Sequence, residues 1–155
     1  MKKSKKTTGV TVRLVTPQDE KRWRELFEGY CVFYKRELSD TLTAYTWARI
    51  VDAAIPVHAI VAEHDSDGVI GIANYLIHEH TLGLTPVCYL GDLFVDPALR
   101  ATGVGEQLIE WLTDEMKRKR WSRLYWHTRL NNYRARGLYD KFTAHSDFVR
   151  YTIYE

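Results

Sequence analysis

Residues 89–112 read YLGDLFVDPALRATGVGEQLIEWL, a stretch that predicts a strand, a sharp loop and then a helix. Leu90–Val95 is an apolar run with one polar break, Asp92, and is long enough for a buried strand. Asp96-Pro97 ends the strand, because proline lacks a backbone N–H and biases the residue before it away from helix. Beyond the loop, apolar residues recur at helical spacing: Leu108, Ile109, Leu112 and Met116.

The loop between that strand and helix, Arg100–Gly105 (RATGVG), has the chemistry of an anion-binding site. The first turn of a helix presents unpaired N–H groups at the positive end of its dipole. Gly103 and Gly105 let a phosphate approach these groups closely, since no Cβ stands in the way. The loop does not match the P-loop, and Leu108 replaces the third glycine of the dinucleotide pattern. A tight turn that only closes on the helix is the structural alternative.

A second motif follows one predicted strand later, at Asn132–Tyr139 (NYRARGLY). Asn132, Ala135 and Tyr139 are spaced i, i+3 and i+7, so they share one helix face. A capping asparagine, a small packing residue and a half-buried tyrosine are the structural explanation of the same spacing. Taken in this order and at this separation, the loop motif and the second motif resemble the GCN5-related N-acetyltransferases, the GNAT family, over about residues 10–155.

The rest of the chain predicts a mixed α/β fold, more specifically an α+β domain. Asp65–Gly68 is a hairpin signal that makes the early strands an antiparallel meander, whereas the strand–helix–strand unit at 87–128 predicts a parallel pair. The resemblance implies the same order, with about six to seven strands, about four helices, and the cofactor between two parallel central strands that splay apart. Strands are predicted at 10–15, 58–63, 69–80, 87–95, 124–128 and 148–154, and helices from 16 or 18 to 34, 41 to 54, 103 to 120, and 131 or 132 to about 142.

The chain has 155 residues, which suits one domain at residues 9–155 after a basic tail at 1–8. The net charge is +2, but four lysines lie in the first six residues, so the remainder carries about −2. This balance predicts a disordered tail and argues against a nucleic-acid-binding face. Cys31 and Cys88 lie in apolar surroundings and predict reduced thiols of a cytoplasmic protein. No apolar run approaches the ~18 residues of a membrane span, so no membrane partner is predicted.

The resemblance implies that acetyl-CoA binds along the strand–loop–helix unit. Backbone N–H groups of the loop, helped by the Arg100 side chain, would hold the pyrophosphate, and Asn132 would bond the pantetheine or pyrophosphate arm. Arg134, Arg136 and residues 117–120 either meet the ribose phosphate or form a solvated helix face. The residues expected to contact the cofactor are Phe94, Val95, Arg100, Ala101, Thr102, Gly103, Val104, Gly105, Asn132, Ala135 and Tyr139.

The resemblance also implies direct transfer, in which a neutral amine attacks the thioester without a covalent enzyme intermediate. The thioester oxygen gains negative charge and needs a preplaced donor. In the family this donor is a backbone N–H near the end of the central strand, here Phe94 or Val95. The Tyr139 phenol would protonate the departing thiolate, because a phenol keeps its proton at neutral pH.

The group that accepts the amine proton is open, because Gly91 stands where many relatives carry a glutamate. Asp92 is the first candidate, acting directly or through water, and a carboxylate that only bonds nearby backbone or an arginine is its alternative. His127 is the second candidate, since histidine titrates near neutral pH, although a strand histidine also packs without a catalytic role. Some relatives need only an amine that arrives already deprotonated.

By the same resemblance, the first two helices and the end of the strand at 69–80 line the acceptor pocket. The run around Asp92 looks like the branch that contains fungal histone and polyamine acetyltransferases, which suggests a polyamine, a lysine-type amine, a lysine-bearing peptide or another small amine. In that branch the last strand, here 148–154, forms part of a homodimer contact. The acceptor residues are predicted to be Tyr30, Tyr34, Trp47, Glu79, Asp92 and His127, although core packing explains most of the aromatic ones equally well.

Two other functions remain as alternatives. A non-catalytic acyl-CoA-binding or sensing module is motivated by Gly91, and a nucleic-acid-associated protein is motivated by the lysine-rich tail. His78 and His80 share one strand face but have no clear third ligand, so no metal site is predicted.

Overall fold

Five strands form one mixed sheet, in the order β1-β2-β3-β4-β5, in the computed structural model, which describes residues 8–99 and 103–155. Neighbouring strands from β1 to β4 are antiparallel, whereas β4 and β5 are parallel. This confirms the predicted α+β class, with its meander and its parallel pair. The strands are β1 (Val10–Leu14), β2 (Val57–His64), β3 (Gly68–His78), β4 (Val87–Val95) and β5 (Leu124–Trp126).

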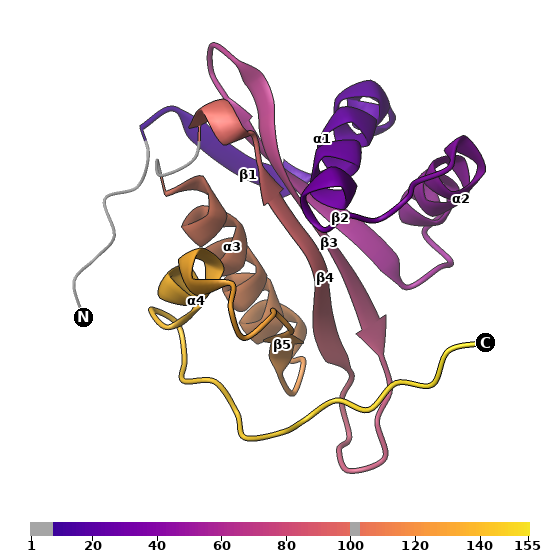
Figure 1. The fold of residues 1–155 in the computed structure, drawn as a ribbon, viewed down its shortest axis with the longest axis vertical. Helices are drawn as coiled ribbons and strands as arrows, with labels where there is room; N and C mark the ends of the chain where they lie inside the picture. Colours follow the sequence, from indigo (N-terminus) through magenta and orange to yellow (C-terminus); the bar gives the residue numbers. More distant parts are fainter. Residues whose placement is uncertain (1–7, 100–102) are drawn as a thin grey trace.

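Helices cover both faces of the sheet. Figure 1 shows α1 and α2 on one side of the sheet, and α3 and α4 on the other. The predicted helix after β1 is divided into a short 3-10 turn, η1, and α1, whereas α2 and α3 begin within one residue of their predicted starts. The elements are η1 (Pro17–Asp19), α1 (Glu20–Phe33), α2 (Asp40–Val51), η2 (Pro97–Leu99), α3 (Val104–Lys119) and α4 (Tyr133–Tyr139).

Charged groups fix the start of α1 against β1. The Asp19 carboxylate accepts a 2.7 Å hydrogen bond from the backbone N–H of Thr16 and another of 2.7 Å from Arg13 Nη1. The bond from Arg13 is the main reason that the pKa of Asp19 lies below its usual value. Apolar residues then recur at helical spacing along α1 and turn its stripe toward the sheet. The buried residues of this stripe are Trp23, Leu26, Phe27, Tyr30 and Cys31.

The two faces of the sheet carry separate apolar cores. On the α1 side, Trp23 packs against Phe27 and Trp47, with ring centroids 4.9 and 5.1 Å apart. On the α3 side, the sheet packs against Leu108 and Leu112, which are fully buried. Cys31 and Cys88, predicted to lie in the core as thiols, are buried and free, one on each face.

Strand β4 changes its neighbours halfway along. It pairs with β5 only from Cys88 to Leu90, although it continues to Val95. On its other edge, Asn74 of β3 is opposite Asp92 and the next residue of β3 is opposite Leu90, so Gly91 is an extra residue in a β-bulge. The parallel pair therefore opens beside the second half of β4, as the resemblance implied.

The predicted strand at 148–154 is wrong for this chain as described. Residues 140–155 have no helix or strand, so the described residues contain five strands rather than six or seven. The alternating apolar pattern is present, but a strand needs a partner, and β5 ends at Trp126 rather than at Thr128. The segment instead exposes Phe148, Val149, Tyr151, Ile153 and Tyr154.

Of the predicted tail, only Thr8 lies within the described residues. No helix among residues 8–99 and 103–155 is long and apolar enough to cross a membrane.

Two helical glycines offer a matched test of how closely α1 approaches β4. A Cβ on Gly29 would lie 2.8 Å from the Phe94 ring, whereas a Cβ on Gly137 of α4 would meet nothing within 4 Å. We expect Gly137→Ala to raise the free energy of unfolding by about 0.5–1 kcal/mol through helix propensity. Gly29→Ala should lower it by about 1 kcal/mol or more, because overpacking outweighs the same propensity gain. Urea unfolding measures both, and equal stabilisation by the two substitutions would contradict the close contact.

Candidate active site

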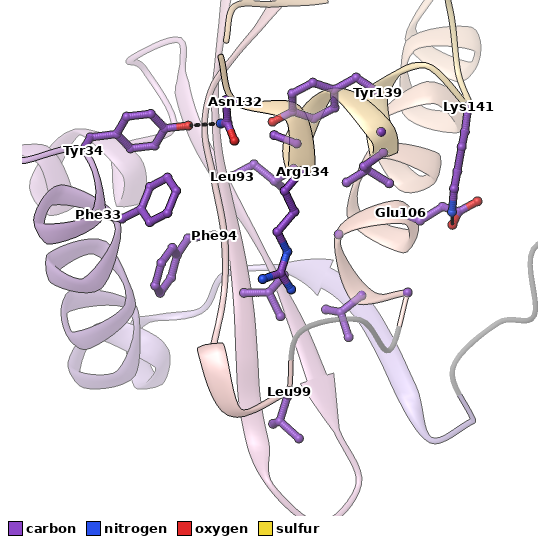
Figure 2. Close-up of a pocket in the computed structure, with 17 residues that line it drawn as sticks. Phe33, Tyr34, Leu93, Phe94, Leu99, Glu106, Asn132, Arg134, Tyr139 and Lys141 are labelled. Atoms are coloured by element: carbon purple, nitrogen blue, oxygen red, sulfur yellow. Dashed lines mark hydrogen bonds and ion pairs between the residues drawn. The ribbon is translucent and has the colours of Figure 1, made fainter. Parts of the chain in front are cut away.

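A cavity of about 560 Å³ opens beside the second half of β4 (Figure 2). One wall is β4, the floor is the start of α3, and the opposite wall is α4. Phe33 and Tyr34 at the end of α1 close one side. Many of the residues predicted to hold a cofactor therefore line one space. The lining is Phe33, Tyr34, Leu93, Phe94, Val95, Leu99, Gly103, Val104, Gly105, Glu106, Asn132, Arg134, Ala135, Gly137, Leu138, Tyr139 and Lys141.

The start of α3 forms the anion-binding end of this cavity. Gly103 precedes the helix with φ of 82°, a left-handed conformation that residues with a Cβ rarely adopt. The backbone N–H groups of the first turn of α3 have no partner inside the helix and lie at its positive end. Arg100, Ala101 and Thr102, which were predicted to take part, lie outside the described residues.

Cationic side chains lie near the same end. Figure 2 shows the Arg134 side chain reaching from α4 into the gap between β4 and the start of α3. Lys141 Nζ donates a 2.9 Å hydrogen bond to Glu106 Oε2. An elongated thioester cofactor with a phosphorylated end fits this arrangement, because Arg134 and the N–H groups at the start of α3 lie at one end, whereas the charge of Lys141 is balanced by Glu106.

Tyr139 stands at the other end of the cavity, against β5. Its ring makes an edge contact with Trp126, with centroids 5.4 Å apart. Burial is the main cause that raises the pKa of Tyr139 to about 12, and the phenol of Tyr34 adds to it. The phenol therefore keeps its proton throughout the neutral range, as a proton donor must.

Asn132 bridges α4 to α1 across the mouth of the cavity (Figure 2). Its Nδ2 donates to the Tyr34 hydroxyl at 3.4 Å and to Thr128 Oγ1 at 3.1 Å. Its side chain makes no cap bond to α4, so capping is not its role in this structure. Ala135 lines the cavity one turn later.

The N–H groups of β4 alternate between the two edges of the strand. The N–H of Asp96, just past β4, donates to the Ile70 carbonyl oxygen across the β3 edge at 2.8 Å. By alternation, the N–H of Phe94 points toward β3, whereas that of Val95 points toward the edge beside the cavity. Of the two predicted oxyanion donors, Val95 has the orientation that this role needs, and the role stays a prediction.

Asp92 lies on the α1 side of the second half of β4, the opened stretch of the strand that extends beyond its pairing with β5. Its Oδ2 accepts a 3.0 Å hydrogen bond from Asn74 Nδ2. The Tyr30 hydroxyl reaches two acceptors, the Asp92 carboxylate and the Gly91 carbonyl oxygen, which is 3.4 Å away. Burial raises the pKa of Asp92, while the bonds from Asn74 and Tyr30 and the charge of Arg36 oppose this rise. A carboxylate with a raised pKa is a stronger proton acceptor than an exposed one.

The structure brings some of the remaining predicted acceptor residues to the site and leaves the others away from it. The rings of Tyr30 and Tyr34 lie 4.7 Å apart, at the end of α1. His127 Nδ1 lies 3.4 Å from the Tyr89 hydroxyl on the same sheet face as Asp92. Trp47 is buried in the core, and Glu79 is exposed beyond the end of β3, so neither joins this group.

Sequence reasoning missed Asn74, Trp23 and Tyr89. The bulge at Gly91 places Tyr89 and Asp92 on one face although they are three positions apart. An isolated glycine inside a strand pattern is a bulge signal, and this signal was present in the sequence. Among residues 8–99 and 103–155, no group of three or more His, Cys, Asp or Glu side chains could hold a metal ion.

Comparison with known proteins agrees with this geometry. The model of the acetyltransferase (GNAT) family matches residues 20–143. D-amino-acid N-acetyltransferase HPA3 of Saccharomyces cerevisiae is 31% identical over 143 residues, which cover 92% of this chain and 89% of that protein.

Two solved structures show how widely the fold is shared. A ribosomal-protein-alanine N-acetyltransferase from Brucella melitensis biovar Abortus 2308 has a TM-score of 0.80 at 20% identity, covering 94% of this chain and 99% of the other. AAC(6')-Iy in complex with the bisubstrate analogue CoA-S-monomethyl-acetylneamine has a TM-score of 0.80 at 21% identity, covering 94% of this chain and 98% of the other. The chain belongs to the acetyltransferase (GNAT) family and is an N-acetyltransferase that depends on acetyl-CoA.

Proposed function

We propose that this enzyme transfers the acetyl group directly to the amine of a small acceptor, between Asp92 and Tyr139. The observation that carries the proposal is that these groups flank the opened stretch of β4 from different faces of the sheet. Asp92 bonds to Asn74 on the α1 face, whereas Tyr139 packs in the α3 core. An amine that enters from the α1 face meets a carboxylate, and a thiolate that leaves along the α3 face meets a phenol.

The proton balance of the reaction follows from this placement. Bound acetyl-CoA supplies a thioester whose C–S bond breaks as the new C–N bond forms. Asp92 accepts one proton from the attacking nitrogen, directly or through water, and Tyr139 donates one to the departing sulfur. The backbone N–H of Val95 donates to the carbonyl oxygen while it carries negative charge. Solvent then returns a proton from Asp92 to Tyr139, so the enzyme is unchanged.

The same proposal assigns the acceptor as an amine that also carries a carboxylate. Burial is the main cause of the raised pKa of Tyr89, and the charges of Arg36 and Arg150 oppose that rise. Arg36 acts on Asp92 in the same way. The positive charges of Arg36, which acts on Asp92, and of Arg150, which acts on Tyr89, attract a carboxylate and repel the several charges of a polyamine. A D-amino acid, the acceptor class named for the yeast relative, fits this balance.

We further propose that the enzyme is a homodimer joined through residues 148–154. β5 is an edge strand of three residues, and unpaired edges tend to pair with other chains. The exposed segment has the alternating apolar pattern of a strand, and Ile153 is 100% exposed. A second copy would supply the neighbour that this segment needs in order to form a strand.

An acceptor panel tests the function. We expect thiol release from acetyl-CoA with D-amino acids, and kcat/KM at least about tenfold lower with the matching D-amino-acid amides, because the amide removes only the carboxylate charge. The panel also contains the L-enantiomers, spermidine and a lysine-bearing peptide. A preference for spermidine or for the amides would contradict the acceptor assignment. Tight CoA binding without release for any amine would instead support an acyl-CoA-sensing module.

Tyr139→Phe tests the proton donor. We expect kcat to fall by about 10²-fold or more, because general acid catalysis of this kind contributes about 10²–10⁴-fold. The dissociation constant of CoA, measured by calorimetry, should stay unchanged. Tyr133→Phe on the same helix is the matched control, since Tyr133 is 75% exposed. An unchanged kcat in Tyr139→Phe would remove this phenol from the mechanism.

Charges placed in the C-terminal segment test the dimer. We expect the double substitution Val149→Asp, Tyr151→Asp to convert a dimeric enzyme to monomers, because paired charges oppose burial of a strand face. Light scattering after size-exclusion chromatography gives the mass. Leu84→Asp in the exposed loop after β3 is the control and should leave the mass unchanged. A wild-type monomer at micromolar concentration would rule out the proposed contact.

A further inference from the structure

Asn74 lies in the middle of β3, on the face that α1 covers, and is only 3% exposed. Its Oδ1 accepts a 2.9 Å hydrogen bond from Trp23 Nε1 of α1. Its Nδ2 donates the 3.0 Å bond to Asp92 Oδ2. A continuous line of polar atoms therefore runs from a fully buried indole, through one amide, to the carboxylate at the reacting centre.

The direction of this line is set by Trp23. An indole N–H can only donate, whereas an asparagine amide has one accepting and one donating end. With Oδ1 turned to Trp23, the amide must present Nδ2 to Asp92. Asp92 Oδ2 then has to accept the hydrogen bond from Asn74, which it does when this oxygen carries no proton. A reversed amide would leave the indole N–H facing another donor and unpaired in the core, which is unfavourable.

We propose that Trp23 and Asn74 are positioning residues that hold Asp92 as a proton acceptor pointed at the incoming amine. The inference rests on the proposed role of Asp92 in the transfer reaction. Neither residue touches the reacting atoms, and both act through the carboxylate.

The packing around Trp23 fixes the direction of the hydrogen bonds from Trp23 through Asn74 to Asp92. Its ring is 0% exposed and packs between Phe27 and Trp47, so the indole N–H cannot turn away from β3. On the other side, the bulge at Gly91 brings Asp92 opposite Asn74 and onto the α1 face. Without the extra residue, the side-chain alternation of β4 would turn Asp92 to the opposite face.

The charge balance at Asp92 sets the direction of the expected effect. Burial raises the pKa of Asp92, and the hydrogen bond from Asn74 is the strongest of the interactions that lower it. The titratable and charged groups that act on Asp92 are Tyr30, Cys31 and Arg36 from α1 and the turn after it, and Tyr89 from β4. Loss of the Asn74 donor removes a stabilising bond to the charged form, so the pKa of Asp92 rises. Activity that needs the carboxylate is then lost at a higher pH as the solution is acidified.

The experiment measures kcat as a function of pH at a saturating acceptor concentration. The fall in kcat at low pH, which is the acid limb of the profile, then reports the pKa of groups in the bound complex. Three variants are compared with wild type: Asn74→Leu, Trp23→Phe, and the double variant Trp23→Phe, Asn74→Leu. We expect the acid limb of each variant to move up by about one pH unit, because a hydrogen bond to a charged group has roughly that effect on a pKa. The acid limb of the double variant should move by the same amount as that of Asn74→Leu alone, since both residues act through the same chain of hydrogen bonds to Asp92.

The double variant also protects the test against misfolding, because it removes the indole N–H that Asn74→Leu alone would leave unpaired in the core. Carbon-13 NMR titration of the Asp92 carboxyl gives its pKa without any turnover, and a rise in the variants is the expected result. Tyr75→Phe is the matched control, because Tyr75 is the next residue of β3, equally buried, and packs in the α3 core. Its acid limb and the Asp92 titration should equal those of wild type.

Asp92→Asn separates failure of this inference from failure of the proposed function. If Asp92 is the proton acceptor, its replacement removes the acid limb and most of kcat. If Asp92→Asn keeps the limb, the assignment of the base is wrong. If Asp92→Asn removes the limb while Asn74→Leu and Trp23→Phe leave both the limb and the NMR titration at their wild-type pH, Trp23 and Asn74 are structural residues only.

Discussion

The partial pairing between β4 and β5 is the constraint on which the site depends. These strands share a parallel ladder only from Cys88 to Leu90, after which β4 continues to Val95 without pairing with β5. A fully paired sheet would have filled the space now occupied by the cavity. Because the ladder opens, the start of α3 and the face of α4 reach the same stretch of β4 from one side, while α1 reaches it from the other. The two halves of an acetyl transfer can then meet at one strand.

Burial acts on both proposed proton-transfer groups in the same direction and suits them for opposite tasks. It raises the pKa of Tyr139 to about 12, which keeps the phenol protonated and able to donate. It also raises the pKa of Asp92, which strengthens the carboxylate as a base, while the bonds from Asn74 and Tyr30 keep the charged form accessible. An acid and a base therefore coexist at one site, because the two groups begin from ordinary pKa values about six units apart.

The sequence predicted the elements with their own periodicity and missed what depends on distant partners. The strand at 87–95 has its predicted bounds, and the helix at 103–120 differs by one residue at each end. The strand at 148–154 failed because an alternating pattern does not specify the neighbour that a strand must pair with. In the site, Tyr139 and Asn132 were found because their spacing on one helix face matches a motif of the family that the chain resembles. Asn74 was missed, since an asparagine inside a strand run shows nothing of its bond to Asp92.

Helix α1 connects both halves of the site, although no residue of α1 was expected to act on the cofactor. Trp23 reaches the amide behind Asp92, Gly29 lets the helix lie against the Phe94 ring, and Tyr34, just past the helix, meets Asn132 at the cavity mouth. These contacts follow one another along a single rigid element. The placement of α1 therefore bears on the carboxylate, the end of β4 and the mouth of the cavity together.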